Sequence, residues 1–138
     1  MKEYKKSNFL GIGLTLLTKD EIVEAILNFS LFGKQRVIAY LNAHCVNIAY
    51  SDSDYKRIFN SIDILHADGI GVVWAARFLG IALPERVNIS DFCDRVFKAI
   101  AAKNITLYFL GGKAHVVKLA TKELKRKINN IKIIGMHH

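Results

Sequence analysis

The chain has 138 residues, of which 51% are hydrophobic and 23% are charged. This length fits one domain, and this composition excludes a disordered, collagen-like or low-complexity protein. The two cysteines, Cys45 and Cys93, form no C-x-x-C pair, which indicates free thiols in a reducing compartment. We therefore expect one globular domain over residues 1–138.

The formal net charge of +8 is unevenly distributed. Residues 1–94 hold 10 Lys and Arg against 11 Asp and Glu, whereas residues 95–138 hold 10 basic residues and a single acid, Glu123. Such an asymmetry predicts an anionic partner: a nucleic acid, an anionic lipid surface or a phosphorylated substrate.

The N-terminal region superficially resembles a signal peptide, because a basic start at Met1–Lys6 precedes an apolar run at Phe9–Leu17. No small-x-small cleavage site follows, and Thr18 and Glu21 have the spacing of a capping box at a helix start. No apolar stretch approaches the ~18 residues that a membrane-spanning helix needs. We expect neither secretion nor a transmembrane helix in this segment.

Strand-like and helix-like patterns alternate along the chain. In chain order we expect strand Phe9–Leu14, helix Lys19–Phe29, strand Gln35–Leu41, helix Ala43–Tyr50, helix Asp54–Asn60 capped by Ser53 or Asp52, strand Ile62–His66, helix Gly71–Phe78, loop Gly80–Asn88, a helix from cap Ser90 to about Lys103, strand Ile105–Leu110, helix Ala114–Ile128 and strand Ile131–Ile134. Strands rich in Val, Ile and Leu between helices predict an α/β fold, with a mostly parallel sheet covered by helices on both faces.

Ligands of open α/β sheets bind beyond the carboxyl ends of the strands, so polar residues at those positions are the candidates. Asn42 follows the first such strand, and suits a sugar or phosphate, or simply caps the next helix. Asp68 follows the second strand, and a carboxylate beside Gly69 and Gly71 is placed to act as a general base. The alternative is that Asp68 is the N-cap of the Gly71–Phe78 helix. His66 is interpreted as structural.

A third strand end carries Gly111, Gly112 and Lys113 before a long basic helix. A glycine turn at a helix N-terminus offers free N–H groups to an anion, although a plain tight turn explains the same residues. Arg86 suits a diphosphate, or forms an ion pair with Glu85 or Asp91. The basic helix is interpreted as a solvated face, so nucleic-acid binding is not expected. The histidines and cysteines have no metal-ligand spacing.

These motifs occur in a characteristic order: Leu41-Asn42-Ala43, Asp68-Gly69-Ile70-Gly71, Pro84-Glu85-Arg86-Val87, Phe109-Leu110-Gly111-Gly112-Lys113 and Ile134-Gly135-Met136-His137-His138. In order and spacing, the series resembles the bacterial glycosyltransferases of the WecG/TagA/CpsF type. Those enzymes act in the synthesis of the wall teichoic acid linkage unit, enterobacterial common antigen and capsule or exopolysaccharide. The resemblance covers nearly the whole chain.

The resemblance implies a Rossmann-like α/β fold and an inverting, metal-independent transferase without a cofactor. Such an enzyme moves N-acetylmannosamine or a related sugar from a UDP-sugar to a polyprenyl-diphosphate-linked sugar, at the cytoplasmic face of the cell membrane. Asp68 then matches the general base, Asn42 a polar active-site residue, and Arg86 the arginine that holds diphosphate charge. Tyr40 and His137, together with Gly69, Gly71, Gly111, Gly112 and Lys113, are the expected substrate-binding residues.

The sequence also departs from the family pattern. Tyr40 stands where many members have Thr, and Ile89 replaces a common glycine. The family continues beyond the double histidine with Gly-Tyr-Phe, more sheet and a basic appendage, so we expect this chain to lack the C-terminal part of the catalytic domain. An anionic membrane surface is the expected peripheral partner, and an uncovered sheet edge favours a homo-oligomer. The alternative function is a non-catalytic nucleotide- or anion-binding module.

Overall fold

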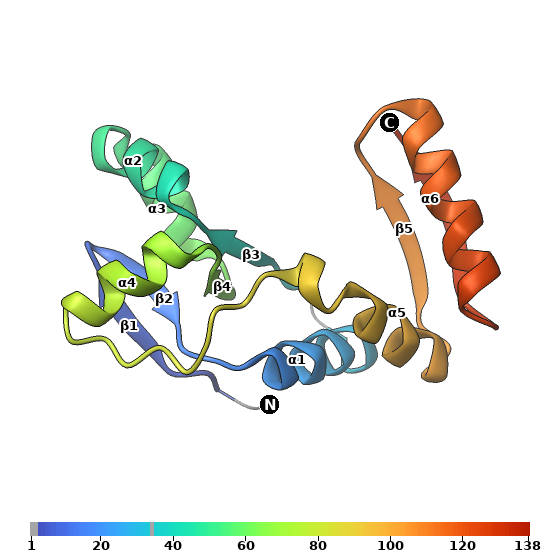
Figure 1. Ribbon diagram of the computed structural model, residues 1–138, viewed down its shortest axis with the longest axis horizontal. Helices are drawn as coiled ribbons and strands as arrows, with labels where there is room; N and C mark the ends of the chain where they lie inside the picture. Colours follow the sequence, from blue (N-terminus) through green and yellow to red (C-terminus); the bar gives the residue numbers. More distant parts are fainter. Residues whose placement is uncertain (1–2, 34) are drawn as a thin grey trace. The chain divides into compact units, whose positions relative to one another are not determined.

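The structure, a computed structural model, describes residues 3–33 and 35–138 (Figure 1). Met1, Lys2 and Lys34 belong to the expected 1–138 domain but lie outside the described residues. The chain divides into two compact units, one formed by residues 1–22 and 34–91 and the other by residues 23–33 and 92–138. Both units combine helices with a parallel strand pair, so the predicted α/β class is confirmed. No helix in residues 3–33 and 35–138 is both long and apolar enough to cross a membrane.

The first unit begins with a hairpin of β1 (Lys6–Phe9) and antiparallel β2 (Ile12–Thr15). The prediction of one strand over Phe9–Leu14 is therefore wrong. Leu10 and Gly11 form a two-residue turn with φ of 53° and 81°, and the Asn8 side chain accepts a hydrogen bond from the Gly11 N–H at 2.7 Å. Two positive φ values match the right-handed twist of a hairpin, but an apolar residue such as Leu10 gives no turn signal in the sequence.

Helix α1 (Lys19–Leu31) follows, and its start is the predicted capping box. The Glu21 carboxylate accepts a hydrogen bond from the Thr18 N–H at 2.9 Å, and the Thr18 hydroxyl accepts one from the Glu21 N–H at 3.2 Å. The helix begins in the first unit and continues in the second.

The centre of the first unit is the parallel pair of β3 (Ile38–Leu41) and β4 (Ile64–Ala67). Helices α2 (Ala43–Ser51) and α3 (Ser53–Ser61) connect the two strands, and α4 (Ile70–Phe78) follows β4. All four residues of β4 are buried, so both of its faces are covered. Thr15, also buried, accepts a hydrogen bond from the Leu65 N–H at 3.0 Å and so joins the hairpin to β4.

The second unit contains α5 (Cys93–Ala102), β5 (Thr106–Leu110), α6 (Ala114–Lys127) and β6 (Lys132–His137) besides most of α1. Strands β5 and β6 are parallel, with a bulge between Leu107 and Tyr108. Figure 1 shows β5 running beside α6, and Leu107 and Leu124 pack in one cluster with Ile128.

The predicted helix from Ser90 to about Lys103 starts later than expected. Ser90 lies in a short 3-10 turn, η1 (Ile89–Asp91), and its N–H donates to the Asn88 side chain at 2.9 Å. The N-cap of α5 is Phe92, which has no side-chain capping bond. The prediction that Ser90 caps this helix is wrong, because Ser90 lies within the preceding 3-10 turn, two residues before the N-cap.

Candidate functional site

Six of the predicted site residues gather where β3 and β4 end. The register pairs Tyr40 with His66 and Leu41 with Ala67, and the Asp68 N–H then donates to the Leu41 carbonyl at 2.9 Å. Since parallel strands end at the same edge, Asn42 and Asp68 leave the sheet side by side. We call Tyr40, Asn42, Asp68, Gly69, Gly71 and Arg86 the β3–β4 site.

Arg86 reaches this edge through the backbone of its neighbour. The Val87 N–H donates to the carbonyl of Ala67, the last residue of β4, at 3.1 Å. The segment after α4 therefore runs back along the end of β4, which places Arg86 near the residue that precedes Asp68. This hydrogen bond joins residues 20 positions apart, and their spacing in the sequence does not predict it.

Asn42 is the N-cap of α2, as one of its two predicted interpretations required. Its side-chain oxygen accepts a hydrogen bond from the Cys45 N–H at 2.9 Å. The amide nitrogen of Asn42 donates no hydrogen bond to any group of residues 3–33 and 35–138. Capping thus fixes the side chain and leaves the amide NH2 group, with its two N–H donors, for a ligand.

Asp68 does not cap α4, so that interpretation is wrong. The N-cap is Gly69, and no side chain satisfies the N-terminal N–H groups of this helix among the described residues. Gly69 has φ of 89° and ψ of 146°, a region that is essentially restricted to glycine. The half-buried carboxylate of Asp68 makes no hydrogen bond or ion pair within residues 3–33 and 35–138. It therefore remains available to accept a proton or a ligand hydrogen bond.

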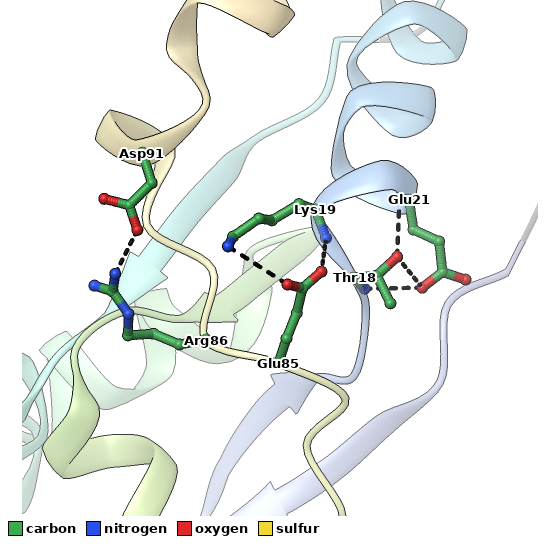
Figure 2. Close-up of polar contacts among 6 residues, drawn as sticks. All are labelled: Thr18, Lys19, Glu21, Glu85, Arg86 and Asp91. Carbon is green, nitrogen blue, oxygen red and sulfur yellow. Dashed lines mark hydrogen bonds and ion pairs between the residues drawn. The ribbon is translucent and has the colours of Figure 1, made fainter.

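Arg86 pairs with Asp91, one of the two acids that the sequence offered (Figure 2). The other, Glu85, instead accepts a hydrogen bond from the Lys19 N–H at 2.6 Å, with the Lys19 Nζ 3.5 Å away. Its carboxylate thereby adds negative charge at the N-terminus of α1, where the helix dipole favours it. The Arg86 and Asp91 side chains are 38% and 40% exposed, so a diphosphate in solution has access to this guanidinium.

His66 lies beneath the site as a buried side chain, in agreement with its structural interpretation. It is 2% exposed, and neither ring nitrogen has a hydrogen-bond partner of good geometry among the described residues. Burial lowers the pKa of His66, and the backbone of Val87 and the Asp68 carboxylate oppose this shift only in part. A neutral imidazole therefore adjoins Asp68 at pH 7. The opposite residue on β3, Tyr40, is 51% exposed.

The remaining four candidates gather at the ends of β5 and β6 in the second unit. Leu110 pairs with His137, and the Gly111 N–H donates to the His137 carbonyl at 2.9 Å. Gly111 and Gly112 have φ of 109° and 80°, and Lys113 is the N-cap of α6 without a side-chain capping bond. We call Gly111, Gly112, Lys113 and His137 the β5–β6 turn. It presents backbone N–H groups and one exposed lysine rather than a carboxylate.

No group of three or more His, Cys, Asp or Glu able to hold a metal ion occurs in the part of the chain that the structure describes. The arrangement therefore offers two kinds of chemistry. The β3–β4 site holds a free carboxylate, an amide donor and an arginine, whereas the β5–β6 turn suits an anion at a helix N-terminus.

Comparison with known proteins places this sequence in a family. The family model described as "Glycosyl transferase WecG/TagA/CpsF family" matches residues 7–138. A Staphylococcus aureus (strain NCTC 8325 / PS 47) protein named N-acetylglucosaminyldiphosphoundecaprenol N-acetyl-beta-D-mannosaminyltransferase is 28% identical over 136 residues, which cover 96% of this chain and 53% of that protein.

A Bacillus subtilis (strain 168) protein of the same name is 28% identical over 99 residues, covering 72% of this chain and 39% of its own length. The chain thus spans about half the length of the Staphylococcus aureus relative. The family model covers nearly all of the sequence, including every residue of the β3–β4 site and the β5–β6 turn. The chain therefore belongs to the WecG/TagA/CpsF family of glycosyl transferases.

Proposed function

We propose that this chain carries the catalytic part of an N-acetylmannosaminyltransferase that uses a UDP-sugar donor and a polyprenyl-diphosphate-linked sugar acceptor in cell-wall synthesis. The observation that carries the proposal is Asp68, a carboxylate at a strand end that is not used for capping or ion pairing within the described residues. Membership of a glycosyl transferase family and the names of the two relatives support the substrate classes.

In the proposed reaction Asp68 is the general base. The acceptor hydroxyl oxygen attacks the anomeric carbon of the donor, and its proton passes to the Asp68 carboxylate. The bond from the anomeric carbon to UDP breaks, UDP leaves with the electron pair, and the configuration inverts. A direct displacement of this kind needs one base and positive charge or N–H donors for the departing diphosphate.

The charge that develops on UDP requires donors, and the chain offers two sets. Arg86 can exchange Asp91 for a diphosphate, because two exposed partners of an ion pair lose little on separation. Lys113 and the N–H groups that follow Gly111 and Gly112 are the second set. In this proposal Asn42 and Tyr40 contact the sugars, and Gly69 and Gly71 allow substrate to approach the backbone.

A lipid-linked acceptor requires the protein to reach the membrane surface. We assign the enzyme a peripheral location on the inner face of the cell membrane, with anionic lipid attracting the basic residues of the chain. The basic helix α6, with Lys125, Arg126 and Lys127 in its last turn, supplies part of that charge.

The test is release of UDP from UDP-N-acetylmannosamine by the intact protein with a polyprenyl-diphosphate-linked N-acetylglucosamine acceptor. We expect turnover, and a loss of about 10²–10⁴-fold in kcat for Asp68→Asn, as removal of a general base produces. Asp54→Asn is the matched control, since that exposed carboxylate pairs only with Arg57 on α3. Full turnover in Asp68→Asn would eliminate Asp68 as the base.

The second candidate function, a non-catalytic nucleotide- or anion-binding module, rests on the β5–β6 turn. Its geometry favours an anion whether or not any reaction follows. This candidate predicts UDP binding, measured by calorimetry, without UDP release by the intact protein under the same conditions. Binding that Gly112→Val weakens, with no transfer, would favour the module over the enzyme.

A further inference from the structure

Helix α4 is apolar on both of its faces. Val72, Val73 and Ala76 are buried and form the inner face of the helix. Ile70, Trp74 and Phe78 follow one another at intervals of four residues and are 51%, 65% and 92% exposed. Residues four apart lie above one another on a helix, so these three side chains form one continuous stripe. We call them the α4 stripe.

The α4 stripe is unusual for a helix in contact with water. The only charged residue of α4 is Arg77, in its last turn, and that residue is exposed. A helix that is apolar all round is normally buried, and a contiguous exposed apolar patch marks an interaction site. Exposed Trp and Phe beside Arg are the residue types that occupy the interface between lipid headgroups and acyl chains.

The position of the α4 stripe links it to the β3–β4 site. Helix α4 begins at Ile70, two residues after Asp68, and its nine residues extend about 13 Å. We propose that the α4 stripe inserts into the headgroup region of an anionic bilayer, so that α4 lies along the membrane surface with Arg77 among lipid phosphates. Asp68 then lies at the depth where a membrane-anchored diphosphate sugar presents its hydroxyl; this last step rests on the proposed function.

The area of the stripe favours a bilayer over a second copy of the chain. Fully buried Trp and Phe side chains cover about 150–250 Å² each, and the three residues of the stripe are only partly exposed, so together they offer at most roughly 500 Å². A stable protein interface buries about 800 Å² on each partner. Insertion into lipid has no such minimum, since each apolar side chain contributes separately and Arg77 adds attraction to anionic headgroups.

Trp74 is the only tryptophan in the 138 residues, so its fluorescence reports on the stripe. The intact protein is mixed with vesicles of equal parts phosphatidylglycerol and phosphatidylethanolamine, and the difference between wild type and Trp74→Phe isolates the Trp74 signal. We expect a blue shift with vesicles, protection from iodide and quenching by lipids brominated on the acyl chain. Vesicle-bound protein whose Trp74 stays accessible to iodide would overturn the proposal.

A blue shift of Trp74 emission that is present without vesicles and grows with protein concentration would also overturn the proposal, because it would indicate that a second copy of the chain covers the stripe. Emission that is blue-shifted at every concentration would instead indicate another part of the protein, with the same consequence. In both cases iodide protection would be independent of lipid.

A pair of variants tests the energetics. Phe78→Glu should weaken vesicle binding about tenfold or more, because a buried Phe contributes about 1.5–3 kcal/mol. Tyr50→Glu is the matched control, since Tyr50 on α2 is 93% exposed in the same unit but lies outside the stripe. Equal weakening by both substitutions would contradict a specific role for α4.

The two proposals can fail separately. Phe78→Glu should keep UDP release with a short-chain, water-soluble acceptor and lose it with acceptor embedded in vesicles. If wild type inserts Trp74 but releases no UDP with either acceptor, only the proposed function is wrong. If wild type turns over both acceptors and Trp74 remains in water, only the membrane contact of α4 is wrong.

Discussion

The two parallel strand pairs of this chain are buried to different degrees. Every residue of β4 is buried, whereas alternate residues of β5 and β6 face solvent. The solvent-facing side of the second pair is largely apolar and includes Tyr108, Leu110, Ile134 and Met136. The same strand–helix connection therefore occurs once after a fully buried strand, β4, and once in a strand pair that is covered on one face.

The residues at the ends of the two strand pairs also differ in burial, and those of the first pair are again the more buried. In the β3–β4 site Asn42, Asp68 and Arg86 are half-buried and lie near a buried histidine, whereas the β5–β6 turn presents exposed glycines and a lysine. A buried strand can hold the carboxylate that follows it in a fixed, partly buried position, within reach of a substrate proton. An exposed turn can bind an anion through backbone N–H groups but offers no such control. In the proposed reaction the base therefore belongs to the first pair, and the second pair is proposed only to bind an anion.

The largest expected effect tests the difference in burial. Leu65→Ala in β4 should lower the free energy of unfolding by about 2–5 kcal/mol, because Leu65 is 0% exposed in the core. Leu107→Ala in β5, where the side chain is half-buried, should lower it by about half as much or less. Urea denaturation followed by circular dichroism gives both values. Equal losses would mean that the covered face of the β5–β6 pair, where Leu107 packs, is buried as completely in solution as β4.

Glycine substitutions at the β3–β4 site should produce the next largest effect. Gly69→Ala forces a side chain to φ of 89°, which costs on the order of 1–3 kcal/mol. Gly71→Ala, in the first turn of α4 with no atom within 4 Å of an added Cβ, should instead stabilise the protein by up to about 1 kcal/mol. Thermal unfolding distinguishes the two. Since Gly71→Ala should fold normally, any loss of UDP release in that variant would indicate a substrate in contact with the backbone.

Local rules in the sequence were sufficient for several of these features. The spacing of Thr18 and Glu21 predicted the start of α1, since a capping box involves only neighbouring residues. The end-of-strand rule placed Asn42 and Asp68 together, because parallel register brings the carboxyl ends of neighbouring strands to one edge. The capping role of Asn42 was one of two interpretations, and the structure confirms it.

Other features depend on contacts between distant residues, and the sequence could not predict them. The pairing of Glu85 with Lys19 removed one candidate partner of Arg86 and left Asp91 as the other. The hydrogen bond from Val87 to Ala67 joins Arg86 to the strand end across a long loop. The turn at Leu10 was missed because its side chain is apolar and only its backbone reveals the turn.

The pH dependence of stability should report on His66. Burial lowers the pKa of His66 below its ordinary value of 6.5, so the unfolded chain binds a proton that the folded chain resists. The contribution of His66 to the free energy of unfolding is therefore fully present above about pH 6.5, and it is lost as the pH decreases toward the pKa of His66 in the folded protein. His66→Leu should lose less stability than wild type between pH 7.5 and 5.5 in urea denaturation.

His115→Gln is the matched control for that measurement, because His115 is exposed and lies at the start of α6. Its stability should follow the wild-type pH dependence. If the stability of His66→Leu depends on pH as strongly as that of wild type, other groups cause the effect. The imidazole of His66 would then be solvated in the folded protein.

The smallest expected effect on stability concerns Arg86 and Asp91. Both side chains are more than one-third exposed, and water screens an ion pair of this kind, so Asp91→Asn should change the free energy of unfolding by less than about 1 kcal/mol. The same substitution leaves the guanidinium free for an anion, and the affinity for UDP should rise. Arg86→Gln should lower that affinity while changing stability equally little. Calorimetric titration with UDP measures these two opposite changes in affinity. If both variants weaken UDP binding, Asp91 positions Arg86 for the ligand and does not compete with the ligand. The ion pair would then be part of the binding site itself.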